Sequence, residues 1–175
     1  MRKGMVIWFT GISGAGKTTV ATLLQERFDS DGLENELLDG DVVRQYFDDD
    51  LGYTEKERIQ NITRTAYAAG LLSKHGIIAI VAVIAPYYGV RDFIRQHTDN
   101  YIQVYVKVSV ETAIRRDVKG HYKKYEDGEM ENLIGVDDGY DIPRSPNLVL
   151  DTDLESPIES LEKLVSYLQG CGIID

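Results

Sequence analysis

Apolar residues along the chain form short continuous runs, and amphipathic segments separate these runs. Continuous apolar runs at residues 5–10 and 77–84 predict strands that are buried on both faces, and residues 101–108 predict a third strand. Shorter runs at residues 36–38 and 148–150 predict two further strands. A sheet whose strands are apolar throughout is typical of parallel strands that helices cover on both sides.

The segments between the runs repeat their apolar residues at helical spacing. The first such segment follows the first strand, and its periodic residues are Val20, Leu23, Leu24 and Phe28. Further helices are predicted at residues 54–74, 90–97, 110–116 and 158–168. Thr54 and Glu57 have the spacing of a capping box at the start of the longest helix. Strands and helices in alternation predict an α/β fold with a parallel sheet and helices on both faces.

Residues 117–144 interrupt this alternation. They are polar, rich in glycine and charge, and too numerous for an ordinary connection in a compact domain. One interpretation is a solvated surface loop. The favoured interpretation is a lid that covers a bound ligand.

Composition limits the classes of function. The 175 residues fit one domain, residues 1–175, that can bury a single core. With 19 basic and 29 acidic residues the net charge is -10, which argues against general binding of nucleic acids or anionic membranes. A small anionic substrate remains compatible, because a basic pocket can lie inside an acidic protein.

The single cysteine, Cys171, excludes an internal disulfide and favours a reducing compartment. The apolar part of the N-terminal segment is too short for a signal peptide, and it is interpreted as a strand. The run at residues 77–85 is far shorter than the roughly 20 residues that cross a bilayer as a helix. A cytoplasmic protein without a membrane partner is therefore expected.

The first strand leads into the segment GISGAGKT, which matches G-x-x-x-x-G-K-[ST] at every fixed position. In this pattern backbone N–H groups and a helix N-terminus surround the phosphates of a nucleotide. The lysine reaches the terminal phosphates, and the threonine hydroxyl is suited to bind Mg²⁺. The predicted nucleotide-binding residues are Gly11, Ile12, Ser13, Gly14, Ala15, Gly16, Lys17, Thr18 and Thr19.

This loop predicts ATP binding without deciding what is done with the ATP, because GTPases, motors and small-molecule kinases share it. A GTPase normally carries an N-K-x-D segment that recognises the base, and the sequence has none. A motor ATPase usually needs a longer chain. A small-molecule kinase is favoured, with no nucleic-acid partner.

The segment LDGDVVR follows the second strand, where ligands gather in open α/β sheets. In an extended chain Asp39 and Asp41 project to the same side. One carboxylate can hold magnesium while the other orients an attacking hydroxyl. Arg44, one helical turn further on, can bind an anion. Asp39 can alternatively cap the helix that follows.

Segments along nearly the whole chain together resemble the adenylylsulfate kinase (APS kinase) family. They are GISGAGKTT, LDGDVVR, LGYTEKERIQNITR, APYYGVRDFIR, RRDVKGHYKK and GEMENLIGVDDGYDIP. The resemblance implies a single P-loop kinase domain with a lid segment. It implies transfer of the ATP γ-phosphate to the ribose 3′-hydroxyl of adenosine 5′-phosphosulfate (APS), which gives PAPS, with Mg²⁺ as cofactor. It also implies a homodimer, which no residue pattern predicts.

The same resemblance assigns roles to residues. Asp41 is the base or orienting group, Lys17 is the other catalytic residue, and Thr18 and Asp39 are metal-binding. The implied substrate-binding residues are Asp41, Arg44, Tyr53, Arg58, Asn61, Ala85, Lys119 and Leu133. Without the family, Arg58 could equally be a surface charge and Asn61 an exposed helix residue.

In the implied mechanism the lid closes over both nucleotides and excludes water. Lys17, the metal and an arginine near the lid, Arg115 or Arg116, stabilise the transferred charge.

Departures from the family pattern gather around the acceptor. Thr63 replaces an arginine, Ala85 replaces a serine, and Leu133 with Ile134 replaces a Phe-Thr pair. The missing phenylalanine removes stacking on the acceptor's base worth about 0.5–1.5 kcal/mol. Either APS binds less tightly, or the acceptor is a related nucleotide such as cytidine diphosphoramidate. A nucleotide-binding module without catalysis is a third hypothesis, which the retained carboxylates disfavour.

Overall fold

The computed structural model describes residues 4–47 and 50–174, which form a five-stranded sheet in the order β2-β3-β1-β4-β5. All neighbouring strands are parallel, which confirms the predicted fold class. The strands are β1 (Met5–Thr10), β2 (Asn35–Asp39), β3 (Ile78–Ala82), β4 (Tyr101–Lys107) and β5 (Leu148–Asp151).

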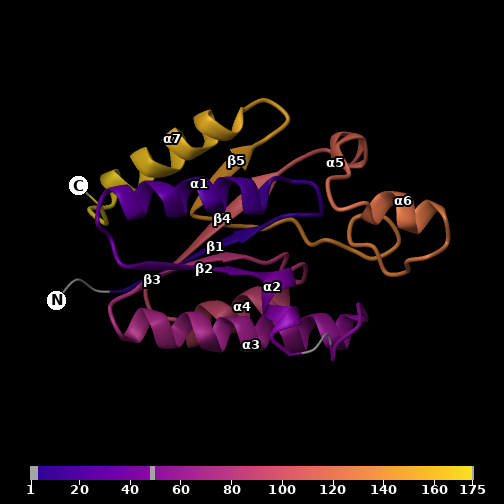
Figure 1. Cartoon of the computed structure of the whole chain (residues 1–175), viewed down its shortest axis with the longest axis horizontal. Coiled ribbons are helices and arrows are strands. Elements are labelled where there is room, and N and C mark those ends of the chain that lie inside the picture. Colours follow the sequence, from indigo (N-terminus) through magenta and orange to yellow (C-terminus); the bar gives the residue numbers. More distant parts are fainter. Residues whose placement is uncertain (1–3, 48–49, 175) are drawn as a thin grey trace.

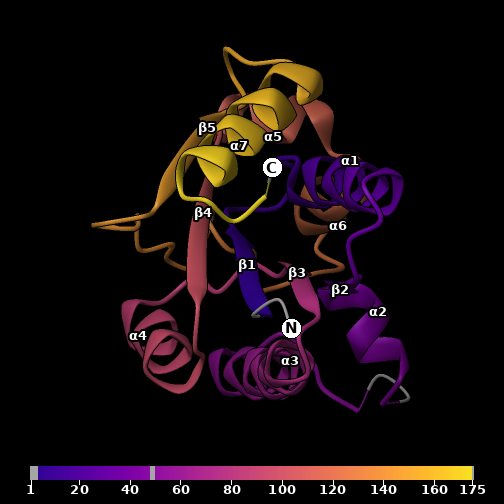
Figure 2. The same ribbon diagram turned by 90° about the vertical axis from the view of Figure 1, so that its left-hand side faces the viewer.

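Helices cover both faces of this sheet (Figures 1 and 2). On one face lie α1 (Lys17–Ser30) and α7 (Pro157–Gly170), and on the other lie α3 (Glu55–Lys74) and α4 (Tyr88–His97). Shorter helices are α2 (Gly40–Gln45), α5 (Val110–Arg116) and α6 (His121–Glu126). Among the described residues no helix has both the length and the apolar character needed to span a membrane.

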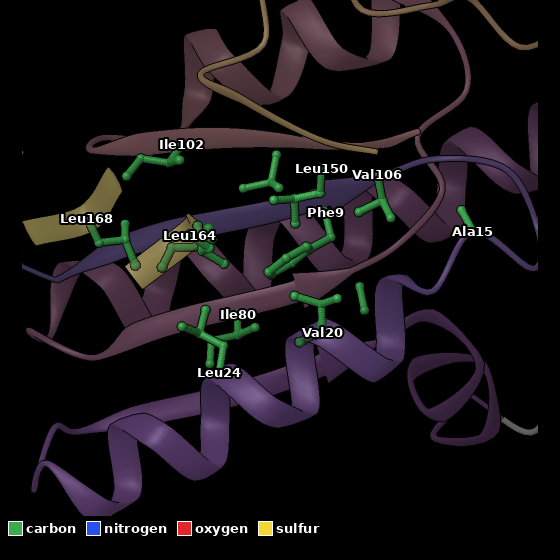
Figure 3. Close-up of a cluster of buried hydrophobic side chains, with 14 of the residues drawn as sticks. Phe9, Ala15, Val20, Leu24, Ile80, Ile102, Val106, Leu150, Leu164 and Leu168 are labelled. Carbon is green, nitrogen blue, oxygen red and sulfur yellow. The ribbon is translucent and has the colours of Figure 1, made fainter. Parts of the chain in front are cut away.

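The central strand β1 divides the core into two layers. Ile7 and Phe9 belong to the cluster that includes α1 and α7, and Figure 3 shows Phe9 among Val20, Leu24 and Leu164. Val6 and Trp8 face the other way, into the cluster with α3 and α4. Because side chains alternate along a strand, every residue of β1 is buried, as the continuous apolar run predicts. The loop after β1 therefore starts from a rigid base.

The start of α3 is fixed by the predicted capping box. The Glu57 carboxylate accepts a hydrogen bond from the Thr54 backbone N–H at 3.1 Å, and the Glu57 N–H donates to the Thr54 hydroxyl at 3.4 Å. These contacts satisfy N–H groups that a helix leaves without partners at its first turn. They hold the first turns of α3 at a defined place beside the end of the sheet.

Residues 117–144 are not wholly irregular, because they contain α6. The carboxylate of Asp117 accepts hydrogen bonds from the backbone N–H groups of Tyr122 at 3.1 Å and Lys123 at 3.0 Å. A helix of six residues is too short to show a periodic apolar pattern, so sequence analysis missed it. Figure 1 shows α6 beyond the end of the sheet.

Candidate active site

A cavity of about 440 Å³ lies at the carboxyl ends of β1, β2 and β3. Its lining comes from the loop after β1, the end of β2, helices α2 and α3, the end of β3 and residues 116–134. Residues at the start of α7 complete one side. Such a place is where parallel α/β sheets bind ligands.

The phosphate loop joins β1 to α1. At the start of α1, Gly16 has a φ of 96°, which favours glycine. A Cβ on Gly11 would lie 2.3 Å from the Val106 carbonyl oxygen, so the loop passes too close to β4 for a side chain there. Of the nine predicted nucleotide-binding residues, 13–19 line the cavity, whereas Gly11 and Ile12 do not.

Lys17 folds back over this loop. Its Nζ donates hydrogen bonds to the carbonyl oxygens of Gly11 and Ile12, each at 2.8 Å. Burial, with a contribution from the charge of Lys119, lowers the pKa of Lys17 to about 8, against the opposing effect of Asp39 and Asp41. Bound phosphates would restore the preference for the charged form, because opposite charges favour ionisation.

Thr18 and Asp39 form a pair of oxygen ligands at the edge of the loop. The Thr18 hydroxyl donates to Asp39 Oδ2 at 2.7 Å, while Oδ1 of the same carboxylate accepts from the Asp41 N–H at 2.9 Å. Asp39 thus caps α2 and also contacts Thr18, the threonine predicted to bind the metal, so both interpretations of Asp39 are compatible with the structure.

These two groups fit a hard divalent cation, which prefers oxygen ligands. No cluster of three or more His, Cys, Asp or Glu side chains that could hold a metal occurs in residues 4–47 and 50–174. A metal held by Thr18 and Asp39 would therefore take most of its ligands from phosphate oxygens and water, as Mg²⁺ commonly does.

Asp41 lies in the first turn of α2. The prediction that both aspartates project from an extended chain is therefore wrong, because the chain becomes helical at Gly40. Both nevertheless line the cavity. Asp41 forms an ion pair with Lys119 from the segment before α6. Burial raises the pKa of Asp41, but the hydrogen bond and charge of Lys119, with smaller contributions from nearby cations, outweigh it, so the carboxyl titrates below its usual range.

Arg58 and Asn61 reach the cavity from one face of α3. Their exposed fractions are 7% and 3%, so the alternative of exposed surface residues is wrong. Arg58 donates to the backbone carbonyl oxygens of Tyr53, at 2.9 Å, and of Asn132. Asn61 Oδ1 is buried and has no hydrogen-bond partner within the described part of the chain. A ligand can satisfy this oxygen, which otherwise costs free energy.

Cations also surround the ring of Tyr53. The guanidinium carbons of Arg44 and Arg58 lie 4.7 and 5.2 Å from its centroid. Arg44 also donates to the Leu51 carbonyl oxygen at 2.8 Å. Leu133 is buried and, like Tyr53, lines the cavity. The structure therefore brings together every predicted acceptor residue except one.

The exception is Ala85. It is fully buried in the core between the sheet, α3 and α4, and it does not belong to the cavity lining. Its carbonyl oxygen accepts a hydrogen bond from Arg91 Nη1 at 3.1 Å. Ala85 thus lies outside the cavity lining, and its contact with the acceptor stays a prediction.

Of the two candidate arginines, Arg116 lines the cavity and donates to the Thr152 hydroxyl at 3.0 Å, whereas Arg115 is exposed outside it.

Sequence analysis missed two titratable residues of the cavity lining, Glu155 and His121. His121 begins α6, and its Nδ1 lies 3.2 Å from the hydroxyl oxygen of Ser13 in the phosphate loop. The only signal in the sequence is a histidine beside the lysines of a glycine-containing segment. That signal carries no information about a contact across 108 positions of the chain.

Comparisons with known proteins agree with this geometry. The family model described as adenylylsulphate kinase matches residues 3–151. An adenylyl-sulfate kinase of a Picosynechococcus strain is 40% identical over 172 residues, which are 98% of this chain and 97% of the relative. One from Halothermothrix orenii is 42% identical over 174 residues, covering 99% of this chain and 94% of the relative.

Solved structures agree with the sequence matches. The APS kinase of Mycobacterium tuberculosis, solved in complex with AMPPNP and APS, has a TM-score of 0.91 at 32% identity and covers 97% of this chain and 99% of its own. A gluconokinase from Sinorhizobium meliloti, at 14% identity and a TM-score of 0.62, shares the fold alone. This chain belongs to the adenylylsulphate kinase family.

Proposed function

We propose that this chain transfers the γ-phosphate of ATP to the ribose 3′-hydroxyl of APS, which gives PAPS and ADP. The observation that carries the proposal is the single cavity that contains the phosphate loop, Asp41 and the buried pair Arg58 and Asn61. A donor phosphate site and a polar acceptor site in one cavity are what phosphoryl transfer between two nucleotides needs. The names of the relatives supply the identity of the acceptor.

The donor half of the cavity binds the ATP phosphates. N–H groups of the loop and the N-terminus of α1 face them, and Lys17 exchanges its carbonyl partners for phosphate oxygens. Thr18 and Asp39 hold Mg²⁺, which supplies charge neutralisation at the phosphates when it is bound. Arg116 adds positive charge from the side opposite to the acceptor residues on α3.

The acceptor half orients the nucleophile. Arg44, Arg58 and Lys119 bind the phosphosulfate, while Tyr53 and Leu133 contact the base. Asp41 orients the 3′-hydroxyl, whose oxygen forms the new bond to the γ-phosphorus as the bond to the ADP oxygen breaks. The hydroxyl proton passes to the Asp41 carboxylate, which is ionised because its pKa lies below the usual range.

Residues 117–144 act as the lid over this site. The cavity lining includes Val118, Lys119, His121 and Met130 from this segment, so its position controls access of water. Exclusion of water prevents loss of the phosphoryl group to hydrolysis. We further infer from family membership a cytoplasmic homodimer whose other partners are small nucleotides.

The proposal is tested by the kcat/KM for phosphoryl transfer from Mg-ATP to APS and to cytidine diphosphoramidate, with the product checked for a 3′-phosphate. We expect APS to be much the better acceptor. A preference for the cytidine compound would instead make Leu133 and Ile134 the marks of a changed acceptor pocket.

The variant Asp41→Asn separates an enzyme from a binding module. We expect ATP binding to persist and kcat to fall by about 10²- to 10⁴-fold, which is typical for loss of a general base. Asp92→Asn, an exposed change on α4, is the matched control. Absence of turnover in the unchanged protein, with ATP still bound, would overturn the kinase function itself.

A further inference from the structure

His121 lies where the donor and acceptor halves of the cavity meet. It lines the main cavity and also a second cavity of about 490 Å³ that Tyr53, Lys124 and Met130 share. Its Nδ1 contacts the hydroxyl of Ser13, a residue of the phosphate loop, at 3.2 Å. Asp41 and Lys119, which form an ion pair, line the same cavity, and their charges act on the imidazole. A ring that contacts the phosphate loop and shares the cavity with Asp41 is in reach of a phosphoryl group that passes from the loop to an acceptor beside Asp41.

The ring is held in this place by its own helix. The neighbouring residue Tyr122 is buried, and its hydroxyl donates to the Ser13 carbonyl oxygen at 3.0 Å. Asp117 accepts the N–H of Tyr122 and so fixes the first turn of α6. Ser13 thus contacts α6 twice, through its carbonyl and its hydroxyl. When α6 covers the cavity, these contacts hold the ring as a side chain must be held to stabilise charge that develops during a reaction.

Charged groups face His121 from every element around it. Asp41 stands on α2, Lys17 shares the main cavity, and Asp117 and Lys119 precede α6. The others are Lys124 on α6 and, across the second cavity, Glu129 and Glu131. Burial lowers the pKa of His121; Asp41 raises it and Lys119 lowers it, so that the ring of the unliganded protein titrates below its usual range. Anionic substrates in the same cavity would favour the charged form.

We propose that His121 is a catalytic residue that takes up a proton when the nucleotides bind and donates a hydrogen bond to the phosphoryl group in transfer. The inference rests on the proposed function, since it assumes a phosphoryl group that passes between the two halves of the cavity. The imidazolium forms no covalent bond: the P–O bond to ADP breaks, the bond to the acceptor hydroxyl forms, and the hydroxyl proton goes to Asp41.

The first test is calorimetric and does not depend on turnover. AMPPNP is bound to the protein near pH 7.5 in two buffers of different ionisation enthalpy, and the number of protons taken up is compared between the unchanged protein, His121→Gln and His75→Gln. His75 is exposed at the end of α3 and serves as the control. We expect proton uptake in the unchanged protein and the control, and a clear loss in His121→Gln. Equal uptake in all three would overturn the proposal.

The second test is kinetic. With Mg-ATP and APS, we expect His121→Gln to lower kcat on the order of 10- to 100-fold. This loss is smaller than that for removal of a fully buried hydrogen-bond donor, because the ring is half-buried. The KM for ATP should change little. The kcat of the unchanged protein should fall as the pH rises through the pKa of His121 in the complex, and this limb should be absent in the variant. His121→Asn, checked for an unchanged melting temperature, repeats the test with a second side chain.

A kcat within about twofold of the unchanged protein in both variants would overturn a role in transfer. If the unchanged protein fails to phosphorylate APS, the proposed function fails. The calorimetric comparison still decides whether His121 takes up a proton when the donor nucleotide binds, so the two failures are distinguishable.

Discussion

Leu133 shows how one side chain can set the strength of acceptor binding. It is 3% exposed and lines the cavity, as does the ring of Tyr53. A leucine removes an acceptor base from water, but it has no π-system to stack on the base. In the proposed acceptor site the aromatic contribution to base binding would come from Tyr53, whose ring also has the guanidinium groups of Arg44 and Arg58 nearby.

The change Leu133→Phe should therefore strengthen APS binding. Stacking worth about 0.5–1.5 kcal/mol corresponds to a KM for APS that is about 2- to 10-fold lower, with the KM for ATP unchanged. Leu133→Met, which adds length without a ring, is the control. Steady-state kinetics with varied APS measure the effect, and a KM equally lowered by methionine would assign the gain to burial rather than stacking.

At the residue scale, the place of a site residue can be predicted when its neighbours in the sequence indicate it. Lys17 and Thr18 belong to a loop whose spacing alone predicts their places beside the cavity. Arg58 and Asn61 share one face of α3, which helical spacing permits. His121 was missed because it meets Ser13 only after the chain has folded, and no residue near it in sequence indicates that contact.

At the scale of elements, residues 117–144 divide into two parts. The second part is fastened to the end of the sheet. Tyr87 donates its hydroxyl hydrogen to Asp138 at 2.8 Å, and the Asp141 N–H donates to the Pro86 carbonyl oxygen at 2.9 Å. Ile134 is 1% exposed and belongs to the larger core cluster. We therefore expect residues 133–142 to be the fixed base of the proposed lid and its moving part to lie before residue 133.

The first part is held less firmly. It lies between Asp117 and Asn132, whose φ angles of 26° and 58° are uncommon for residues other than glycine. Its polar contacts with the cavity are few: Tyr122 and His121 with Ser13, Lys119 with Asp41, and the Asn132 carbonyl oxygen with Arg58. Bends of this kind at both ends are suited to absorb the change in backbone angles when a segment opens.

Hydrogen exchange should separate the two parts. We expect peptides from residues 118–131 to exchange quickly in the free protein and to slow markedly when AMPPNP and APS are both bound. Peptides from residues 133–142 should change little, because their contacts with the sheet exist without ligand. Equal protection of both parts would mean that the whole segment 117–144 closes as one unit.

Whether an element could be predicted from the sequence depends on its length and on whether it buries a repeating face. Long strands and helices bury a repeating pattern, so the sequence predicts β1, β3 and α3 to within a few residues of their observed ends. Helices α2 and α6 each have six residues and are held by Asp39 and Asp117 rather than by a periodic face. Because α2 was not expected to begin at Gly40, Asp41 was placed wrongly on an extended chain.

At the scale of the whole molecule, the basic character of the cavity is opposite to the negative net charge of the protein. The protein carries a net charge of -10, yet its cavity gathers basic side chains. Those that line it are Lys17, Arg44, Arg58, Arg116 and Lys119. A basic cavity in an acidic protein attracts small anions without attracting nucleic acids. Acidic composition and nucleotide binding are thus compatible, as the sequence analysis expected.

Thermal unfolding tests whether this cavity and the core belong to one cooperative unit, which the chain length predicts. We expect a single transition, and AMPPNP with Mg²⁺ at about 100 times its Kd should stabilise the protein by about 2.7 kcal/mol. For a chain of this size the melting temperature should rise by about 5 to 10 °C.

The variant Lys17→Met should abolish most of the rise, because it removes the charge that faces the terminal phosphates. The control variant Lys74→Met should keep the rise in melting temperature. Lys74 lies at the end of α3 that leads into β3, so it is at the edge of the sheet opposite to the cavity. Two separate transitions, only one of them shifted by nucleotide, would contradict a single domain.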